Sequence, residues 1–337
     1  MYEKTLKRIS KMLKGSEKTY FILTHKRHYR EVYFQNNKKA IEFLKIKFDS
    51  SLKKFIIIKK VIYFLIKSRV LQIFLKKIKL SKEFGDVIFV ANQIKGFNLN
   101  KKIVSSFVKE KNMKESFMKS KRIQKKNSEK EFTPKITELN YKIPFSKEEL
   151  LPEYKGKEDY ELFKKLYSFY KYKGIKTISS KKYINFLINK MKEKNIKDDF
   201  IKKTLVNLLH HNQNLLTTTI HGNFTKEQIL LKEGSYVFID WETEKNLITM
   251  DLAKFFSDEG NLLKNNNFNK ILKIYPYEVR KNIKLYLILN EVHLIIEKKK
   301  SLKASKVKEI VIEKITKPSK NKIKNILKTI ELKENNI

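Results

Sequence analysis

The chain has 337 residues, of which 41% are hydrophobic and 12% aromatic, and this composition supports one or two folded cores and excludes general disorder. It contains no cysteine, which excludes disulfide bonds, thiolate catalysis and cysteine-based zinc sites. The formal net charge of +40 attracts anionic partners such as phospholipid headgroups, nucleic acid or phosphorylated glycans. Only six of the 76 cationic residues are Arg, so part of the lysine excess reflects codon bias, and a solvated, non-specific surface is the alternative reading.

Residues 1–87 are predicted to form a basic N-terminal region. Its most distinctive stretch runs from Lys53 to Lys77, where lysines interrupt every apolar run, so it cannot cross a bilayer. We favour a helix pair or strand pair packed against the next domain, and the alternative is an element lying on an anionic membrane surface. The first residues show neither a signal peptide nor a lipidation motif, so we expect a cytoplasmic protein, with peripheral membrane association as the variant of that expectation.

Residues 88–152 are predicted to form a small domain of short strands around one helix. The segment 103–109 has the pattern of a strand with a lysine near its end. Lys109 and Lys111 both lie near that end, and alternation in so short a strand does not fix its register. The segment that follows is helix-like and contains Glu115.

Residues 153–337 are predicted to form a larger helical domain. Apolar groups recur at helical spacing over 160–170 and 183–191, and the pattern of 271–296 indicates two further helices. The lysine-rich tail from Lys298 is expected either to bind polyanions or to fray.

The most informative stretch is the loop His221-Gly222-Asn223 with the two apolar strands that follow it. The turn between the strands is predicted at Glu233-Gly234-Ser235, and the second strand ends at Asp240-Trp241-Glu242. Phosphoryl transfer from a nucleotide needs a group that orients and deprotonates the acceptor hydroxyl, and oxygen ligands that bind magnesium. A hairpin of this kind brings Asn223, Gln228 and Asp240 to one end, where such groups would be needed.

This stretch is similar to the catalytic loop and metal-binding strand of the aminoglycoside phosphotransferase and choline-kinase-like family. The family pattern is His-Gly-Asp-x4-Asn followed by Asp-Trp-Glu, and this chain has His-Gly-Asn-x4-Gln followed by Asp-Trp-Glu. The segment Met250 to Phe255 matches a short Asp-Leu-Ala motif of the family. The resemblance implies an α+β, bilobal protein-kinase-like fold, with a small β-rich lobe, a larger helical lobe and an extra N-terminal region.

The resemblance also implies the catalytic and metal-binding residues. Asn223, next to His221, replaces the catalytic Asp, and its amide can orient a hydroxyl but cannot accept a proton. Asp240 is expected to bind Mg²⁺, and Gln228 replaces the second, amide ligand.

The nucleotide site is expected in the small lobe. The resemblance implies a lysine at the end of the strand 103–109 that contacts the phosphates of ATP or GTP. Lys109 is our choice and Lys111 the rival, with Glu115 as the ion-pair partner. The segment 145–152 resembles the hinge strand that meets the adenine ring through backbone groups, and it carries Glu149 and Leu151. No glycine-rich turn of the G-x-G type precedes this region.

Two classes of function follow. The first is ATP-dependent and Mg²⁺-dependent phosphorylation of a hydroxyl on a sugar or cell-surface glycan, with weakened or lost catalysis because of Asn223. The second is a catalytically inactive kinase-like protein that binds nucleotide, glycan or an anionic membrane surface. Nucleic-acid binding ranks last, because no motif of that class occurs.

Overall fold

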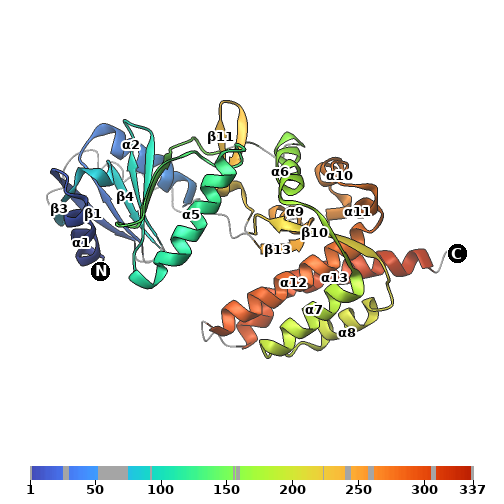
Figure 1. Cartoon of the computed structure of the whole chain (residues 1–337). Helices are drawn as coiled ribbons and strands as arrows, with labels where there is room; N and C mark the ends of the chain where they lie inside the picture. Colours follow the sequence, from blue (N-terminus) through green and yellow to red (C-terminus); the bar gives the residue numbers. More distant parts are fainter. Residues whose placement is uncertain are drawn as a thin grey trace. The chain divides into compact units, whose positions relative to one another are not determined.

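The computed structural model describes residues 2–25, 30–51, 75–91, 93–154, 156, 160–222, 224–239, 244–256, 262–304 and 309–334. It divides into two compact units, one of Met1–Pro152 with Leu230–Ile239 and one of Glu153–Ile229 with Asp240–Ile337. The first unit is built around an antiparallel sheet and the second is mainly helical (Figure 1). The predicted α+β fold class, with a β-rich part and a larger helical part, is therefore confirmed.

The sheet unit contains eight strands in the order β3-β1-β2-β4-β5-β6-β8-β7, and every neighbouring pair is antiparallel. Its elements are α1 (Glu3–Leu13), β1 (Glu17–His25), β2 (Arg30–Phe34), α2 (Lys38–Ser51), β3 (Lys77–Ser81), η1 (Lys82–Phe84), β4 (Val87–Val90), β5 (Ile94–Asn98), β6 (Ile103–Phe107), η2 (Lys111–Met113), α5 (Lys114–Ser128), β7 (Ile136–Asn140) and β8 (Phe145–Glu149).

Alternation along the strands gives the sheet two apolar faces. Tyr20 and Tyr33 belong to a core cluster that contains Leu6 and Ile9 of α1. The neighbouring Phe21 belongs to a second cluster, which contains residues of α2. Because successive side chains of a strand point to opposite faces, α1 and α2 cover opposite sides of the sheet.

The N-terminal residues belong to the same sheet as the small domain. The predicted boundary between residues 87 and 88 falls inside β4, and β1, β2 and β3 continue the sheet beyond that strand. Residues before and after the stretch 53–74 therefore add strands to this sheet. The packing predicted for the stretch itself is not tested by them. Residues 53–74 of the lysine-interrupted stretch lie outside the described residues, and their membrane contact stays a prediction.

The helical unit combines helices with a three-stranded antiparallel sheet in the order β13-β10-β9. Its elements are α6 (Tyr160–Lys173), β9 (Lys176–Ser179), α7 (Ser180–Glu193), α8 (Asp199–Leu208), β10 (Asn214–Ile220), η3 (Lys226–Gln228), β13 (Glu244–Leu247), α9 (Met250–Phe255), η4 (Leu262–Lys264), α10 (Asn266–Leu272), α11 (Tyr277–Lys281), α12 (Ile283–Ala304) and α13 (Glu309–Glu334). The helices predicted over 160–170 and 183–191 are α6 and α7. None of the helices in the described ranges is long and apolar enough to span a membrane.

The predicted hairpin after the His-Gly loop is present. Its strands are β11 (Ile229–Lys232) and β12 (Ser235–Phe238). Glu233 and Gly234 between them have φ values of 50° and 79°. Positive φ at both central residues is the geometry that a two-residue hairpin turn favours, and Gly234 adopts it without strain.

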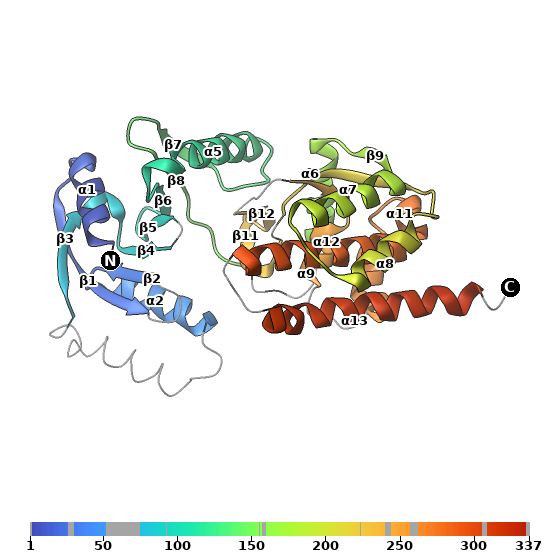
Figure 2. The same cartoon turned by 90° about the horizontal axis from the view of Figure 1, so that it is seen from below.

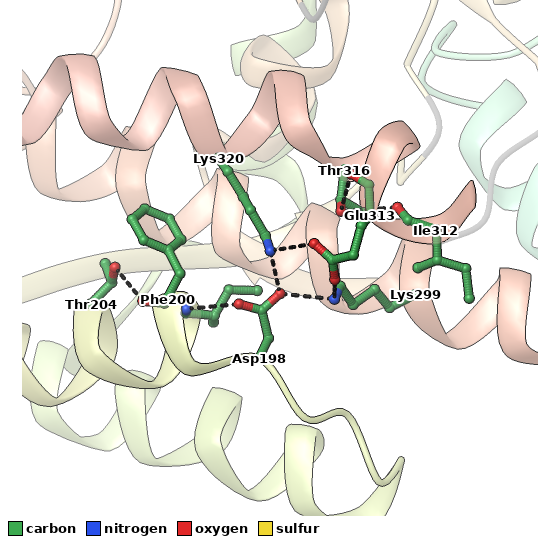
Figure 3. A network of polar contacts seen from close by, with 9 residues as sticks. Asp198, Phe200, Thr204, Lys299, Ile312, Glu313, Thr316 and Lys320 are labelled. Carbon is green, nitrogen blue, oxygen red and sulfur yellow. Dashed lines mark hydrogen bonds and ion pairs between the residues drawn. The ribbon is translucent and has the colours of Figure 1, made fainter. Parts of the chain in front are cut away.

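The described parts of the lysine-rich tail are helical. Residues 298–304 continue α12 and residues 309–334 form α13, and an ionic network around the buried Asp198 and Lys299 joins these helices to the start of α8 (Figure 3). Asp198 Oδ2 lies 2.8 Å from Nζ of both Lys299 and Lys320, and Glu313 pairs with the same two lysines. Burial by itself raises the pKa of Asp198, but the bonds from Lys299 and Lys320 outweigh it and lower that pKa below its usual value. Two lysines of the tail thus form ion pairs with a buried carboxylate of the helical unit.

Candidate functional site

The loop that carries the family motif begins where β10 ends. Strand β10 is the central strand of its sheet, paired with β13 on one side and β9 on the other. His221 and Gly222 follow directly, and Gly222 has a φ of 92°, in the left-handed region. A residue with a Cβ atom is strained in that region, so glycine suits this position and lets the chain turn out of the strand.

Asp251 binds the backbone of this loop. Its carboxylate accepts hydrogen bonds from the His221 amide at 2.7 Å and from the Gly222 amide at 3.0 Å. Asp251 lies in the first turn of α9, within the Asp-Leu-Ala motif, and is fully buried. Hydrogen bonds to a buried charged acceptor are among the stronger ones in proteins, so this carboxylate fixes the loop.

Helix α9 also binds the carbonyl group of Gly222, the residue immediately before residue 223. Lys254, three residues after Asp251, donates a hydrogen bond from its ammonium group to the Gly222 carbonyl. The amide of Gly222 therefore meets a carboxylate and its carbonyl meets an ammonium group. Together these contacts fix the orientation of the backbone immediately before residue 223.

Two buried tyrosines surround the Asp251 carboxylate. The Tyr170 hydroxyl donates to Asp251 Oδ2 at 2.9 Å. Burial, with the charge of Asp251, raises the pKa of Tyr170 well above its usual value, so the hydroxyl keeps its proton and remains a donor. Burial and the same charge also raise the pKa of Tyr275. The carboxylate is thus enclosed by donors and aromatic rings instead of water.

His221, predicted as a catalytic residue, is fully buried in the helical unit. Its ring centroid lies 5.5 Å from that of Phe224, in an edge-to-face arrangement. Phe224 in turn packs against Phe163 of α6. The imidazole therefore belongs to the core beneath the loop, while the backbone of His221 belongs to the loop itself.

Gln228, predicted as a metal ligand, is bound inside its own turn. Its side-chain oxygen accepts hydrogen bonds from the Thr225 amide at 3.1 Å and from the Thr225 hydroxyl at 3.2 Å. These contacts form a capping box at the start of η3. Both lone pairs of that oxygen are used locally, so a metal ion would have to displace these bonds.

Asn223 and Asp240, with Trp241 and Glu242, lie outside the described residues. Their roles as the orienting amide and the magnesium ligand stay predictions. Among the residues that are described, no group of three or more His, Asp or Glu side chains could bind a metal ion together.

The predicted pair of Lys109 and Glu115 is not formed. Lys109 follows the end of β6, and its ammonium group donates to the Tyr2 hydroxyl at 3.0 Å and lies 4.2 Å from the centroid of the Tyr2 ring. Its carboxylate contact is with Glu110, at 3.9 Å. Glu115 is exposed in the first turn of α5. The partner of Lys109 comes from the N-terminal segment, which a reading confined to neighbouring residues could not anticipate.

A different ion pair joins the helix to the sheet. Lys121 of α5 lies 3.2 Å from Glu148 of β8, and their side chains are only 8% and 9% exposed. Gln124, one turn further along α5, also donates to Glu148. In the sequence, Lys121 follows Phe117 by four residues, so it shares the apolar face of the helix, and that position was the signal for its burial.

The predicted hinge segment forms β8 and the chain just after it. The Glu149 carboxylate accepts bonds from the Lys232 ammonium at 3.0 and 3.2 Å and from the Lys135 amide at 3.2 Å. Leu151 is half-buried in the segment after the strand. Glu149 thus joins β8 to the hairpin β11–β12, and its contact with a nucleotide stays a prediction.

Comparison with known proteins finds no protein family whose profile matches the sequence and no curated protein that matches it. Among solved structures, the chain is similar to a choline kinase from Streptococcus pneumoniae, with 11% identity over 68% of this chain and 90% of that chain and a TM-score of 0.44. It is also similar to a choline/ethanolamine kinase family protein from Mesorhizobium loti, with 12% identity, 72% and 84% coverage and a TM-score of 0.45. An ADP-bound aminoglycoside phosphotransferase matches with 12% identity, 69% and 90% coverage and a TM-score of 0.42.

Proposed function

We propose that this chain is a kinase-like phosphotransferase homologue whose helical unit presents residue 223 to an acceptor hydroxyl. The observation that carries the proposal is the binding of the His221-Gly222 backbone by Asp251 and Lys254. The buried Asp251 carboxylate and the Lys254 ammonium group both bind the backbone of the loop that contains the family motif. Such a fixed loop serves a reaction in which the acceptor must be positioned accurately.

The proposed reaction is transfer of a phosphoryl group from ATP or GTP to a hydroxyl on a sugar or cell-surface glycan. Asn223 would orient that hydroxyl through its amide oxygen, but it cannot take up the proton. Phosphoryl transfer has a loose transition state, and positioning and electrostatics supply most of its acceleration. Replacement of the base is therefore expected to slow the reaction without necessarily abolishing it, and general-base catalysis typically contributes about 10²–10⁴-fold.

Bound magnesium would supply positive charge that offsets the charge of the nucleotide phosphates. Asp240 would be its protein ligand. Gln228 does not fit as a second ligand in its observed conformation, because its oxygen accepts two bonds from Thr225. We therefore assign Gln228 to the structure of the turn and leave metal binding to Asp240.

For the nucleotide side, we assign the supporting ion pair to Lys121 and Glu148 instead of Lys109 and Glu115. Kinase-like small lobes join a strand and a helix by a Lys–Glu pair. Here the lysine is on α5 and the glutamate is on β8, the predicted hinge strand. The pair gives a buried ionic link between the helix and the sheet, but it does not place a cation on a strand next to the phosphates.

The alternative function is a catalytically inactive kinase-like binding protein. It is favoured by the local use of Gln228 and by Asn223, since both replace residues that carry the chemistry of the family. The alternative predicts nucleotide or glycan binding without turnover, so binding and turnover must be measured separately.

A thermal-shift titration with ATP and GTP, each with and without Mg²⁺, tests the proposal. A ligand that binds only the folded state raises the melting temperature, by an amount equivalent to about 2.7 kcal/mol at a hundredfold excess over Kd. We expect a magnesium-dependent shift that Asp240→Ala abolishes, while Glu233→Ala, in the exposed hairpin turn, serves as the acidic control. No shift with either nucleotide would refute the proposed nucleotide site, and a shift unchanged in Asp240→Ala would refute the role of Asp240.

A further inference from the structure

One stretch of the helical unit carries many lysines and no acidic residue. Residues 162–192 contain nine Lys and neither Asp nor Glu, although the whole chain has 36 acidic residues. Codon bias in an AT-rich sequence raises Glu together with Lys, so it does not by itself produce a stretch of this kind. The stretch covers most of α6, all of β9 and most of α7.

Five of these lysines occur within twelve consecutive residues at one edge of the three-stranded sheet. The segment runs from the last turn of α6 through β9 to the first turn of α7 (Figure 2). Strand β9 is the edge strand, because it pairs only with β10 in its sheet. We call this surface the lysine edge, and it consists of Lys171, Lys173, Lys176, Lys181 and Lys182.

Four of the five lysines of the lysine edge are exposed and lack an acidic partner among the described residues. Lys171, Lys176, Lys181 and Lys182 are exposed, and Lys173 is half-buried. Within the described residues, none of the four exposed lysines forms an ion pair with a carboxylate. Helix α11, which packs against the neighbouring strand β10, adds Arg280 and Lys281 against the single acidic residue Glu278. The field at this edge is therefore strongly positive.

Part of the lysine edge rests on buried aromatic rings. The Lys171 ammonium lies 5.1 Å from the centroid of the Tyr167 ring, and that of Lys173 lies 5.3 Å from the Phe169 ring. Tyr167 is 9% exposed and Phe169 is fully buried. These rings restrain the lysines from below, but they are not available to stack on nucleic-acid bases.

The backbone next to the lysine edge is also fixed. Ser180 donates from its amide to the Gln213 carbonyl at 2.7 Å, and its hydroxyl accepts from the Gln213 amide at 3.1 Å. The Ser179 hydroxyl caps the first turn of α7 by accepting from the Lys182 amide. Both lysines of α7 thus start from a rigid helix end.

We infer that the lysine edge binds the phosphate groups of a phosphate-bearing polymer. Uncompensated lysines on a rigid base match repeated anionic groups. The segment 171–182 itself carries no large exposed hydrophobic residue to insert into a membrane, and the exposed rings nearest in the chain or on α11 are Phe186 and Tyr277. Single-stranded nucleic acid is disfavoured, because the ring in this segment, that of Tyr172, is half-buried and lies 4.9 Å from the Lys173 ammonium, so it is poorly placed to stack on bases. Duplex DNA needs no such ring and is tested directly below.

The lysine edge and the His221 loop lie at opposite ends of strand β10, which relates polymer binding to the proposed reaction. Strand β10 runs from Asn214, which pairs with Ser179 at this edge, to Ile220, directly before the His221 loop. Seven residues of strand span about 20 Å. In a reading that rests on the proposed function, one part of a phosphorylated glycan binds the lysine edge while a hydroxyl further along reaches residue 223.

Fluorescence anisotropy with labelled, long-chain inorganic polyphosphate tests the inference, since this probe has phosphates but no base, sugar or acyl chain. The test variant replaces the five lysines of the lysine edge by Gln. The matched control replaces five exposed lysines in and just after α5 by Gln and so has the same net charge, and these are Lys114, Lys119, Lys125, Lys126 and Lys130. Melting temperatures of both variants check that they are folded.

We expect the lysine-edge variant to lose at least about tenfold in affinity at 0.15 M salt and the control to lose less than about threefold. The slope of log K against log salt should fall by about 2–3 in the lysine-edge variant, since each phosphate contact contributes about 0.7 for a single-stranded polyanion. Equal losses in the two variants would show that net charge alone binds polyphosphate and would overturn the inference. Absence of binding to the unmodified protein would overturn it as well.

Two further arms separate the other partners. Tighter binding of duplex DNA, or of phosphatidylglycerol vesicles, that depends on the lysine edge would assign the surface to another class of macromolecule and overturn the polymer assignment. The magnesium-dependent nucleotide shift should be unchanged in the lysine-edge variant. Failure of polyphosphate binding with an intact nucleotide shift would reject the lysine edge and leave the proposed function standing.

Discussion

The helical unit and the sheet unit differ in how their sequence motifs are used. In the helical unit, the two motifs of the family resemblance meet, because Asp251 of the Asp-Leu-Ala motif binds the backbone of the His-Gly loop. In the sheet unit, the predicted pair of Lys109 and Glu115 is absent, and Lys109 contacts Tyr2 instead. The match to the Asp-Leu-Ala motif located Asp251 without giving it a partner, whereas the partner predicted for Lys109 is not the one that the structure shows.

The same contrast appears in where the charges lie. The helical unit buries Asp198, Lys299 and Asp251 completely or almost so, and each has partners from another element. In the sheet unit, Lys121 and Glu148 form a comparable buried pair, whereas Lys109 remains partly exposed beside Tyr2. Burial, more than charge, should decide which substitutions matter.

The largest expected effect is that of Asp251→Ala. It would leave the buried amides of His221 and Gly222 and the Tyr170 hydroxyl without their acceptor, at a cost of about 4 kcal/mol in the free energy of unfolding. Urea denaturation measures this loss, and amide hydrogen exchange at His221 and Gly222 should become faster. Asp199→Ala, at an exposed position, is the control and should change stability by less than about 1 kcal/mol. Unchanged amide exchange in Asp251→Ala, or in Asp251→Asn if the alanine variant does not fold, would contradict the role of this carboxylate.

Lys121→Met should destabilise the sheet unit by about 3 kcal/mol. It leaves the Glu148 carboxylate buried without its cation, whereas Lys121→Met combined with Glu148→Met removes both charges and should be less destabilising than the single change. Equilibrium unfolding of the two single variants and the double variant forms the thermodynamic cycle. A double variant that loses the sum of the two single losses would show that the pair is not coupled.

The helical unit should also lose stability in mild acid through His293. This residue of α12 is buried, its ring nitrogen Nδ1 lies 3.1 Å from the Tyr183 hydroxyl, and burial followed by the charge of Lys190 lowers its pKa to about 3. Between that value and the unfolded pKa of about 6.5, only the unfolded chain takes up the proton, so the free energy of unfolding falls as pH falls.

From pH 7 to pH 5, this contribution amounts to about 2 kcal/mol, and His293→Gln should remove it from the pH profile. Urea denaturation of the two proteins at several pH values measures the difference. The control His211→Gln, at an exposed position after α8, should follow the unmodified protein. Parallel pH profiles for the unmodified protein and His293→Gln would contradict this account.

The smallest expected effect is that of Lys109→Met. Its contact with the Tyr2 ring is partly exposed, and such cation–π contacts contribute about 0.5–1 kcal/mol. If the supporting ion pair of the nucleotide site is Lys121 with Glu148, Lys109→Met should leave the magnesium-dependent nucleotide shift unchanged. Loss of that shift in Lys109→Met, with melting temperature preserved, would restore the original assignment of Lys109.

The sequence predicted those features that depend on local pattern. The hairpin around Glu233-Gly234, the helices α6 and α7 and the α+β class all follow from periodicity, turn residues and the family motif. It did not predict contacts between distant segments. Tyr2 and Lys109 are 107 residues apart, and Lys121 and Glu148 are 27 residues apart on different elements. No spacing rule connects such residues, because the fold alone brings them together.

The C-terminal tail is a second example of a contact between distant segments that the sequence did not predict. Its lysines resemble a solvated run, yet Lys299 is fully buried against Asp198 (Figure 3). The acidic partner lies about one hundred residues earlier in the chain. The sequence of the tail alone therefore gives no sign of this contact, and fraying was predicted as one of two outcomes. Composition predicted the charge of the chain but not which charges enter its interior.

The most direct test of the central claim is the magnesium-dependent hydrolysis of ATP and GTP by the unmodified protein and by Asn223→Asp. Water replaces the unidentified acceptor in this assay, and restoring the carboxylate restores the missing base. If Asp251 and Lys254 already hold the loop in a productive arrangement, hydrolysis should rise by about 10²-fold or more in Asn223→Asp. Unchanged hydrolysis in a variant that still binds magnesium-nucleotide would contradict the claim and favour the inactive binding protein.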